Sequence, residues 1–295
     1  MDRSSLFEQH RPRLFGVAYR MLGSRADAED VLQEAYLRWH RASVDDIRSP
    51  EAWLVTATTR LCIDRLRLAR EAREVYVGPW LPEPLVSEAS PPADAQVDVA
   101  SSLSIAFLVV LERLAPEERA AFLLHEVFDS DYGEIAQILG KSEAACRQIV
   151  SRARKRVREN RPRMEVSETA RRAVLDRFVS AVQTQDKEAL LALFAETATW
   201  TSDGGGKARA ALKVVHGRER VVRFVMGVLA RHTDKFSFAA VTVNSEAGLA
   251  IRTPDGALFS VICARTDGAR ILDMFTVLNP DKLPHLRCPT NLAGE

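Results

Sequence analysis

Residues 134–158 read EIAQILGKSEAACRQIVSRARKRVR, a short apolar helix, a glycine turn and a second, basic helix. Ile135 and Ile138 give the first helix an apolar face, and Gly140 is suited to the turn that ends it. Ser142 can cap the next helix, whose first turn carries Glu143. This order of elements is typical of a helix-turn-helix that reads DNA.

The second of these helices separates an apolar face from a basic one. Ala145, Ile149 and Ala153 recur at four-residue steps and are predicted to face inward. Long polar donors remain outside, where they can reach base edges and phosphates in a major groove. These donors are Arg147, Gln148, Ser151, Arg152, Arg154 and Lys155. Residues 141–163 hold nine Lys or Arg against two Glu, while the whole chain has a net charge of +1. The positive charge is therefore local, although an amphipathic helix with a solvated basic face would give the same pattern.

Length and composition predict a globular protein of two or three domains, with 295 residues of which 46% are hydrophobic. No apolar run approaches the ~18 residues that span a bilayer, and the first residues lack the apolar core of a secretory signal. We therefore expect a cytoplasmic protein with no membrane partner. The four cysteines and six histidines are scattered without metal-ligand spacing, so we expect reduced thiols, no metal site and no cofactor.

The N-terminal part is predicted to be helical, with periodic segments at 5–22, 25–41 and 50–70. Ser24 can cap the second helix, and Ser49 can cap the third, which begins with Pro50. The residues predicted to face inward are Val31, Leu32, Ala35 and Trp39 on the second helix, and Trp53, Leu54, Ala57, Leu61 and Leu68 on the third. The third helix leaves Arg60, Arg65, Arg67 and Arg70 as candidates for phosphate contacts.

The composition changes twice further along the chain. Residues 71–101 are rich in Pro, Ser, Ala and acidic side chains, which predicts a linker. Within it, WLPEP at 80–84 places two large apolar side chains in an extended segment that is predicted to dock on a neighbouring surface. From 168 onward, helices at 168–185 and 186–194 precede alternating segments at 197–202, 212–216, 235–245, 247–253, 257–265 and 269–278. This order predicts an α+β domain with a curved antiparallel sheet.

Two further motifs precede the helix-turn-helix: DAEDVLQEAYLR at 27–38, and PEAWL at 50–54 followed by Arg60, Asp64 and Arg67. With them, residues 1–162 resemble a bacterial sigma factor of the extracytoplasmic-function group. The resemblance implies that the 27–38 helix binds core RNA polymerase, that the next helix faces the −10 element, and that the helix-turn-helix reads the −35 duplex of promoter DNA. The implied polymerase contacts are Asp30, Gln33, Glu34 and Leu37. The implied DNA contacts are Arg60, Arg65, Arg67, Arg147, Gln148, Ser151, Arg152, Arg154 and Lys155.

The C-terminal part resembles the SnoaL-like cone fold. Together with WLPEP, DGGGK at 203–207 and NPDKL at 279–283 resemble a sigma-factor subgroup that carries such a domain in place of a separate anti-sigma partner. The implied regulatory residues are Trp80, Leu81, Pro82, Asp203, Gly204, Gly205, Gly206, Lys207, Asn279, Pro280, Asp281, Lys282 and Leu283. The three consecutive glycines reduce side-chain bulk, so another backbone can approach.

The predicted architecture is multidomain, with two all-α sigma domains and a C-terminal α+β SnoaL-like cone domain. The expected boundaries are 1–70 for region 2, 71–101 for the linker, 102–162 for region 4, 168–285 for the cone domain and 286–295 for a tail.

Two other functions compete with this interpretation. A regulator that senses a ligand would explain the helix-turn-helix and the cone, but would leave the two N-terminal motifs without a role. An enzyme would need acid–base groups in the cone, for which Asp203, His216, His232 and Asp273 are candidates in no paired arrangement. We therefore expect a protein that is not an enzyme, and the sequence leaves open whether the cone holds a small-molecule ligand.

Overall fold

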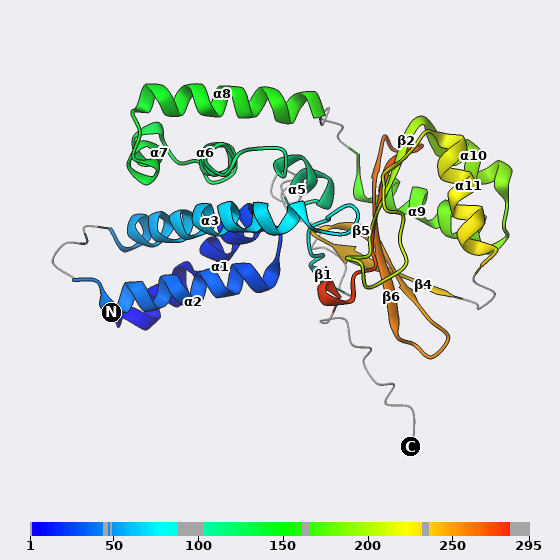
Figure 1. Cartoon of the computed structure of the whole chain (residues 1–295), viewed down its shortest axis with the longest axis horizontal. Coiled ribbons are helices and arrows are strands. Elements are labelled where there is room, and N and C mark those ends of the chain that lie inside the picture. Colours follow the sequence, from blue (N-terminus) through cyan, green and yellow to red (C-terminus); the bar gives the residue numbers. More distant parts are fainter. Residues whose placement is uncertain are drawn as a thin grey trace, which may run out of the picture. The chain divides into compact units, whose positions relative to one another are not determined.

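The computed structural model describes residues 2–43, 47, 49–87, 103–160, 166–231 and 236–283. The chain forms two compact units. A helical unit combines Met1–Val75 with Phe107–Arg163, and a C-terminal unit combines Tyr76–Ala106 with Met164–Glu295. Figure 1 shows the helices of the first unit and the sheet of the second. Part of the expected linker thus belongs to the C-terminal unit.

Helices α1 (Arg3–Leu22), α2 (Arg25–Arg41) and α3 (Pro50–Glu74) begin the helical unit. Gly23 ends α1 in the left-handed conformation, with φ 68°. Ser24 then caps α2 by accepting from the Asp27 amide at 3.2 Å, and Ser49 caps α3 by accepting from the Ala52 amide at 3.3 Å. Both predicted caps are confirmed.

The buried faces of α2 and α3 largely follow the predicted pattern. The four residues predicted to face inward on α2 are buried, as are Leu54 and Leu61 on α3. The prediction for Leu68 is wrong, because its side chain is 69% exposed, while Leu66 is buried. Arg65 already bonds to Asp27 in the first turn of α2, so Leu68 lies about one turn beyond the level at which α2 begins.

Helices α5 (Ile105–Leu111), α6 (Pro116–Glu126), α7 (Tyr132–Leu139) and α8 (Glu143–Asn160) follow. Asp131 caps α7 by accepting from the Glu134 amide at 2.8 Å. Gly140 ends α7 with φ 65°, and Ser142 caps the next helix by accepting from the Ala145 amide at 3.2 Å. Helices α7 and α8 therefore form the predicted helix-turn-helix.

Arg119 connects α6 to the end of α1. Its side chain is only 3% exposed, and its guanidinium donates to the Met21 carbonyl at 2.6 Å and to Glu112 at 2.7 Å. Helix α6 also packs on α3, and α7 packs on α3. The two helical segments thus share one compact unit through a buried, charge-assisted contact.

The C-terminal unit packs helices on a seven-stranded sheet of order β1-β4-β5-β6-β7-β2-β3. The strands are β1 (Val86–Ser87), β2 (Phe194–Asp203), β3 (Val215–His216), β4 (Ser237–Val243), β5 (Glu246–Arg252), β6 (Leu258–Thr266) and β7 (Ile271–Val277), and the helices are α9 (Glu168–Gln183), α10 (Lys187–Leu193) and α11 (Arg218–Leu229). Figure 1 places the three helices on one side of the sheet. Each alternating segment predicted from the sequence overlaps a strand.

Two features of this unit differ from the expectation. Strands β2 and β7 pair in parallel, whereas the sheet was predicted to be antiparallel. Helix α11 was not predicted at all, and its sequence is rich in valine, which has only modest helix propensity. Val221, Val222 and Val225 are buried in the core, so tertiary packing against β2 stabilises a helix that local preference does not specify.

A two-residue turn at Asn244 and Ser245 joins β4 to β5. Both residues have positive φ, 52° and 66°, as a type I′ hairpin turn requires. The turn holds Asn244 2% exposed, next to the edge strand that the linker supplies.

None of the helices in the described part of the chain is long and apolar enough to cross a membrane.

Replacing Arg119 with Met is expected to destabilise the helical unit by about 3 kcal/mol, because Glu112 and the Met21 carbonyl lose a buried charged donor. Arg67→Met is the matched control, since Arg67 pairs with Glu117 at a half-exposed site and such pairs contribute no more than about 1 kcal/mol. Amide hydrogen exchange of α6 measures both changes. Equal protection in the two variants would contradict the role assigned to Arg119.

Candidate functional site

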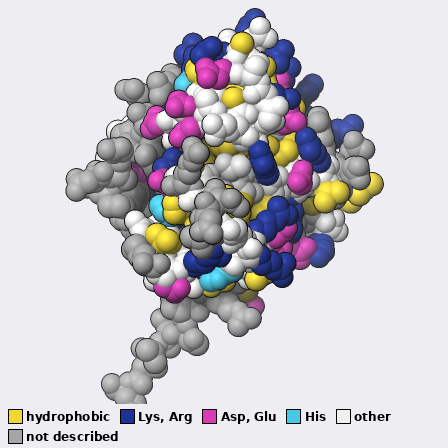
Figure 2. All heavy atoms as spheres, turned by 90° about the vertical axis from the view of Figure 1, so that its left-hand side faces the viewer, with side chains coloured by type: hydrophobic (Ala, Val, Ile, Leu, Met, Phe, Trp, Pro, Cys, Tyr) yellow, Lys and Arg dark blue, Asp and Glu magenta, His cyan; other side chains and the backbone are white. Residues whose placement is uncertain are grey.

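Helix α8 presents the polar face that the sequence predicts. Arg147, Gln148, Ser151, Arg152 and Lys155 are exposed. The inward side carries Cys146, Ile149, Val150, Ala153 and Val157, all buried. Figure 2 shows Lys and Arg side chains gathered at the top of the helical unit, where α8 lies in Figure 1. This face can present a row of hydrogen-bond donors to a duplex.

The basic side chains of α8 are not equally available. Arg154 is half-buried and donates to Glu126 from α6, and this hydrogen bond raises the pKa of Arg154. Arg147 pairs with Glu143 at 2.8 Å and lies 5.2 Å from the centre of the Tyr132 ring. Lys155, with its side chain 79% exposed and a long 3.9 Å contact to Glu159, is freer to meet a phosphate.

Helix α2 exposes the four residues implied to contact polymerase. Leu37 is 52% exposed. Gln33 is exposed, and Glu34 pairs with Arg38 on the same helix at 2.5 Å. Asp30 accepts from Arg65 of α3 at 2.7 Å.

The three arginines of α3 that are expected on DNA, Arg60, Arg65 and Arg67, all have protein partners in this structure. Arg65 bridges Asp27 and Asp30 of α2. Arg67 pairs with Asp64 and with Glu117, which also pairs with Lys141 at 3.0 Å.

Of these three arginines, Arg60 contacts the helix-turn-helix directly. Its guanidinium donates to the Gln137 carbonyl at 2.8 Å and to the Ile138 carbonyl at 2.9 Å. These carbonyls belong to the last turn of α7, where backbone acceptors lack partners within the helix. Arg60 thus holds α3 to the helix-turn-helix.

Asp203, at the end of β2, is the centre of a second site in the C-terminal unit. Its side chain is fully buried. It accepts from the Tyr76 hydroxyl at 2.6 Å, from the Leu81 amide at 2.8 Å and from the Lys282 ammonium at 2.7 Å. Burial raises the pKa of Tyr76, and the hydrogen bond to Asp203 raises it further, so the hydroxyl remains a donor.

The site brings together the three short motifs identified in the sequence. We call residues 76–82, 203–207 and 279–283 the linker clamp. Lys282 also donates to the Leu81 carbonyl at 2.5 Å and lies 4.2 Å from the centre of the Trp80 ring, a cation–π distance. Asn279 donates to the Tyr76 hydroxyl at 2.9 Å. The predicted docking of the 80–84 segment is confirmed, and Leu81 is fully buried.

The glycine run allows the clamp segments to approach one another. A Cβ atom at Gly204 would lie 2.3 Å from the Ala208 carbonyl oxygen. One at Gly205, where φ is +59°, would lie 2.3 Å from the Asn279 amide nitrogen. Gly206 faces Val77, and Lys207 pairs with Asp281 at 2.6 Å on the exposed side. Of the remaining clamp residues, Pro82 and Leu283 are buried and Pro280 is exposed.

Sequence reasoning missed a second attachment of the linker. Val86 and Ser87 form β1, which pairs with the edge of the sheet at β4. Asn244, in the β4–β5 turn, accepts from the Leu85 amide through its side chain at 2.9 Å, and its backbone amide donates to the Leu85 carbonyl at 2.8 Å. Its side-chain amide also donates to the Leu103 carbonyl at 2.9 Å. Asn244, near the end of the predicted 235–245 segment, was the available signal for this turn.

The two aspartates considered as acid–base candidates have structural partners. Asp203 holds the clamp, and Asp273 pairs with Arg265 and accepts from Thr199 at 2.6 Å. His216 lies on β3, while His232 lies outside the described residues. Within the described part of the chain, no group of three or more His, Cys, Asp or Glu could hold a metal ion.

Three domain families match along the chain. The Sigma-70 region 2 family model matches residues 6–72, the Sigma-70 region 4 model matches 104–157, and the SnoaL-like domain model matches 175–277.

One similar protein covers nearly the whole chain, and a second covers about two thirds of it. The ECF RNA polymerase sigma factor SigJ of Mycobacterium tuberculosis is 40% identical over 290 residues, which cover 94% of this chain and 92% of the relative. The probable ECF RNA polymerase sigma factor SigI of the same species is 36% identical over 190 residues, 64% of this chain and 65% of the relative. The crystal structure of M. tuberculosis SigJ aligns with a TM-score of 0.74 and 35% identity, covering 95% of this chain and 98% of that one.

Replacing Asp203 with Asn is expected to destabilise the C-terminal unit by about 3 kcal/mol, because the Lys282 ammonium stays buried without its counter-charge. Asp281→Asn is the matched control: the same substitution removes a pair whose side chains are 57% and 59% exposed, which costs no more than about 1 kcal/mol. Thermal unfolding and exchange of the Leu81 amide measure the two effects. Similar stability and similar Leu81 exchange in the two variants would contradict a clamp centred on Asp203.

Proposed function

The chain belongs to the extracytoplasmic-function RNA polymerase sigma factors, and from this membership we propose which of its surfaces carry the function. A sigma factor acts by binding core RNA polymerase and promoter DNA together. We assign polymerase binding to the exposed face of α2 and duplex reading to α8. The exposed, cation-rich face of α8 in a capped helix-turn-helix is the observation that carries this assignment.

On α8, we assign some exposed residues to contacts with base edges and others to contacts with phosphates. Arg147, Gln148, Ser151 and Arg152 lie on the outer face near the start and middle of the helix, the part that enters a major groove. Lys155 is assigned to a phosphate because its side chain is more exposed than that of the neighbouring Arg154. Arg154 would need to leave Glu126 before it could serve the same purpose.

On α2, polymerase binding requires a surface that the helical unit does not bury itself. Gln33, Glu34 and Leu37 meet this requirement, since an apolar anchor surrounded by polar groups is typical of protein interfaces. Asp30 contributes less freely, because Arg65 already holds its carboxylate.

We propose that the described arrangement of the helical unit is a restrained state. Arg60, Arg65 and Arg67 are assigned to promoter DNA, yet each is engaged by protein acceptors. Arg60 is bonded to the helix-turn-helix itself, so it can meet a phosphate only if α3 and α7 separate. Separation of the two helical segments would also let them reach the −10 and −35 elements together.

We propose that the C-terminal domain regulates this change within the same chain. The linker between the two sigma segments is attached to that domain at the clamp and at Asn244, and a tethered contact acts at an effective concentration of about millimolar. Such an internal contact makes a separate anti-sigma partner unnecessary. The domain works by binding and not by catalysis, since its acidic candidates hold structural partners, and the protein acts in the cytoplasm with the polymerase.

A clamp variant tests this regulation. Transcription from a cognate promoter is expected to rise for Asp203→Asn, because the linker is released, and to stay unchanged for Asp176→Asn, which changes an exposed aspartate of α9 outside the clamp. Equal transcription by both would contradict regulation through the clamp while leaving the sigma activity itself intact.

The double variant Glu34→Arg, Leu37→Asp is expected to lower binding to core polymerase by at least about tenfold, or 1.4 kcal/mol. Both side chains are about half exposed, so the fold should not change. Glu8→Arg, an exposed substitution on α1, is the control. Binding of the double variant as tight as that of the control would show that α2 does not carry the polymerase contact.

Arg147→Ala is expected to relax the preference for the −35 sequence. The variant should lose about 1 to 3 kcal/mol of binding free energy on the preferred −35 duplex and little on the others. Lys155→Ala should instead weaken all sequences alike and lower the salt slope by about 1. Binding titrations on a panel of −35 duplexes at several salt concentrations separate the two patterns. If Arg147→Ala weakened binding to all duplexes equally, Arg147 would not contact bases.

A further inference from the structure

The C-terminal unit contains a cavity of about 440 Å³ between its helices and its sheet. Protein interiors are close-packed and hold few voids larger than a water molecule. A volume in this range is instead typical of small-molecule sites. The cavity is therefore too large to be a packing defect.

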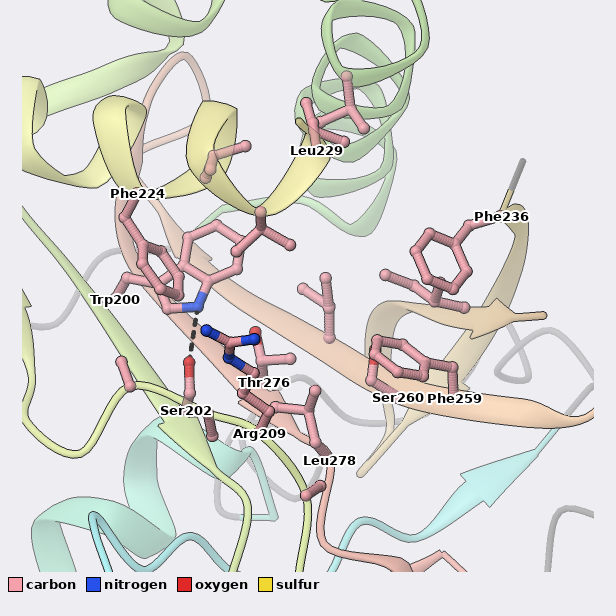
Figure 3. Close-up of a pocket in the computed structure, with 18 of the residues that line it drawn as sticks. Trp200, Ser202, Arg209, Phe224, Leu229, Phe236, Phe259, Ser260, Thr276 and Leu278 are labelled. Carbon is pink, nitrogen blue, oxygen red and sulfur yellow. Dashed lines mark hydrogen bonds between the residues drawn. The ribbon is translucent and has the colours of Figure 1, made fainter. Parts of the chain in front are cut away.

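The wall of the cavity is mostly apolar and aromatic. Figure 3 shows Trp200 and Phe224 on one side, and Phe236 and Phe259 on the other. Phe236 and Phe259 stack on each other at 4.8 Å, and Trp200 lies edge-on to Phe224 at 5.8 Å. An apolar molecule of moderate size would replace empty space with contacts to these rings.

Two hydroxyl groups interrupt this wall. The Thr276 side-chain oxygen is buried and has no hydrogen-bond partner among the described residues, a state that costs free energy unless a ligand supplies the partner. Ser202 accepts from the Trp200 indole at 3.1 Å and keeps its own hydroxyl hydrogen for another acceptor. Both groups can therefore donate to an oxygen atom in the cavity.

The charged residues that line the cavity, among those described, are Arg209 and Arg231, with no acidic residue beside them. Arg209 makes no ion pair with any described carboxylate. Figure 3 shows its guanidinium directed toward Trp200, Ser202 and Thr276. A guanidinium beside two hydroxyl donors matches the acceptors of a carboxylate.

We propose that this cavity binds an apolar monocarboxylate, a hydrocarbon body with one carboxylate held by Arg209 and Thr276, and that its binding keeps the linker clamp closed. The ligand's body fills the aromatic part of the cavity. The two arginines repel a cationic ligand, and Arg209, which is exposed in the free protein, attracts a carboxylate but not a neutral group.

The link to the clamp follows from the strands and the loop that the two sites share. Side chains alternate along β2, so Ser202 faces the cavity while Asp203 faces the clamp. On the neighbouring strand, Thr276 precedes Leu278 and Asn279, whose amides donate to the Asp203 carbonyl at 2.8 and 2.9 Å. The loop at 204–211 places Gly205 and Gly206 against the linker and Arg209 at the cavity. A ligand that fixes this loop also fixes the clamp.

Binding is tested on the full chain without polymerase, so failure of this inference is distinguishable from failure of the sigma activity. The probes are decanoate and 2-naphthoate, which represent straight-chain and flat aromatic acids, with the corresponding alcohols as uncharged controls. Calorimetric titration is expected to show at least one acid bound about tenfold or more tightly than its alcohol. The acid that binds more tightly shows whether the cavity prefers a straight-chain or a flat aromatic hydrocarbon. Binding of neither acid, or equal binding of acid and alcohol, would overturn the proposal.

Variants locate the carboxylate. Arg209→Gln should abolish the preference for the acid over the alcohol, while Arg223→Gln, an exposed arginine of α11 that does not line this cavity, should leave the preference intact. Thr276→Val should weaken binding of the acid without lowering the melting temperature of the free protein, because the hydroxyl that it removes has no protein partner. Unchanged affinity in Arg209→Gln or Thr276→Val would overturn the assigned carboxylate site.

The effect on the clamp is measured by hydrogen exchange of the Leu81 amide, which donates to Asp203. Saturating acid should slow this exchange, toward a limit of about 100-fold at a ligand concentration 100 times its Kd. Unchanged exchange with the cavity filled would overturn the coupling between ligand and linker.

Discussion

The buried carboxylate of Asp203 is the interaction on which the C-terminal unit's hold on the linker depends. Its oxygens accept from a tyrosine hydroxyl, a backbone amide and a lysine ammonium. A carboxylate buried in this way is costly unless it is paired with a positive charge and hydrogen-bonded. Three segments that are far apart in the sequence must therefore arrive together, and the glycines at 204–206 provide the space in which they can do so.

The helical unit uses arginines for a similar purpose, but at more exposed positions. Arg60 caps α7 from outside, and Arg65 and Arg67 join α3 to the acidic residues of α2 and α6. Pairs at such positions are individually weak and sensitive to salt. They suit a contact that must be exchanged for DNA phosphates, whereas separation of the two helical segments must also break the buried contact of Arg119 with the Met21 carbonyl.

Predictions from the sequence succeeded where periodicity, caps or whole motifs carried the signal. The Ser24, Ser49 and Ser142 caps, the inward face of α2 and most of the outward residues of α8 follow from local rules and are confirmed, whereas Arg154 is half-buried against Glu126. Leu68 shows where a periodic pattern fails, because its helix extends beyond its packing partner. Helix α11 was missed because its valines give a local signal that tertiary packing overrides.

The sequence by itself determined the family, the helix-turn-helix and the docking of the 80–84 segment, because short-range patterns encode helix faces, caps and turns. Only the tertiary structure decided which groups meet: Tyr76 on Asp203, Asn244 on the linker, Arg60 on α7, the parallel pairing of β2 with β7, and the aromatic cavity with its unpaired Thr276. These contacts join residues as many as 203 positions apart. Their geometry depends on how the strands and helices pack, which no local pattern records.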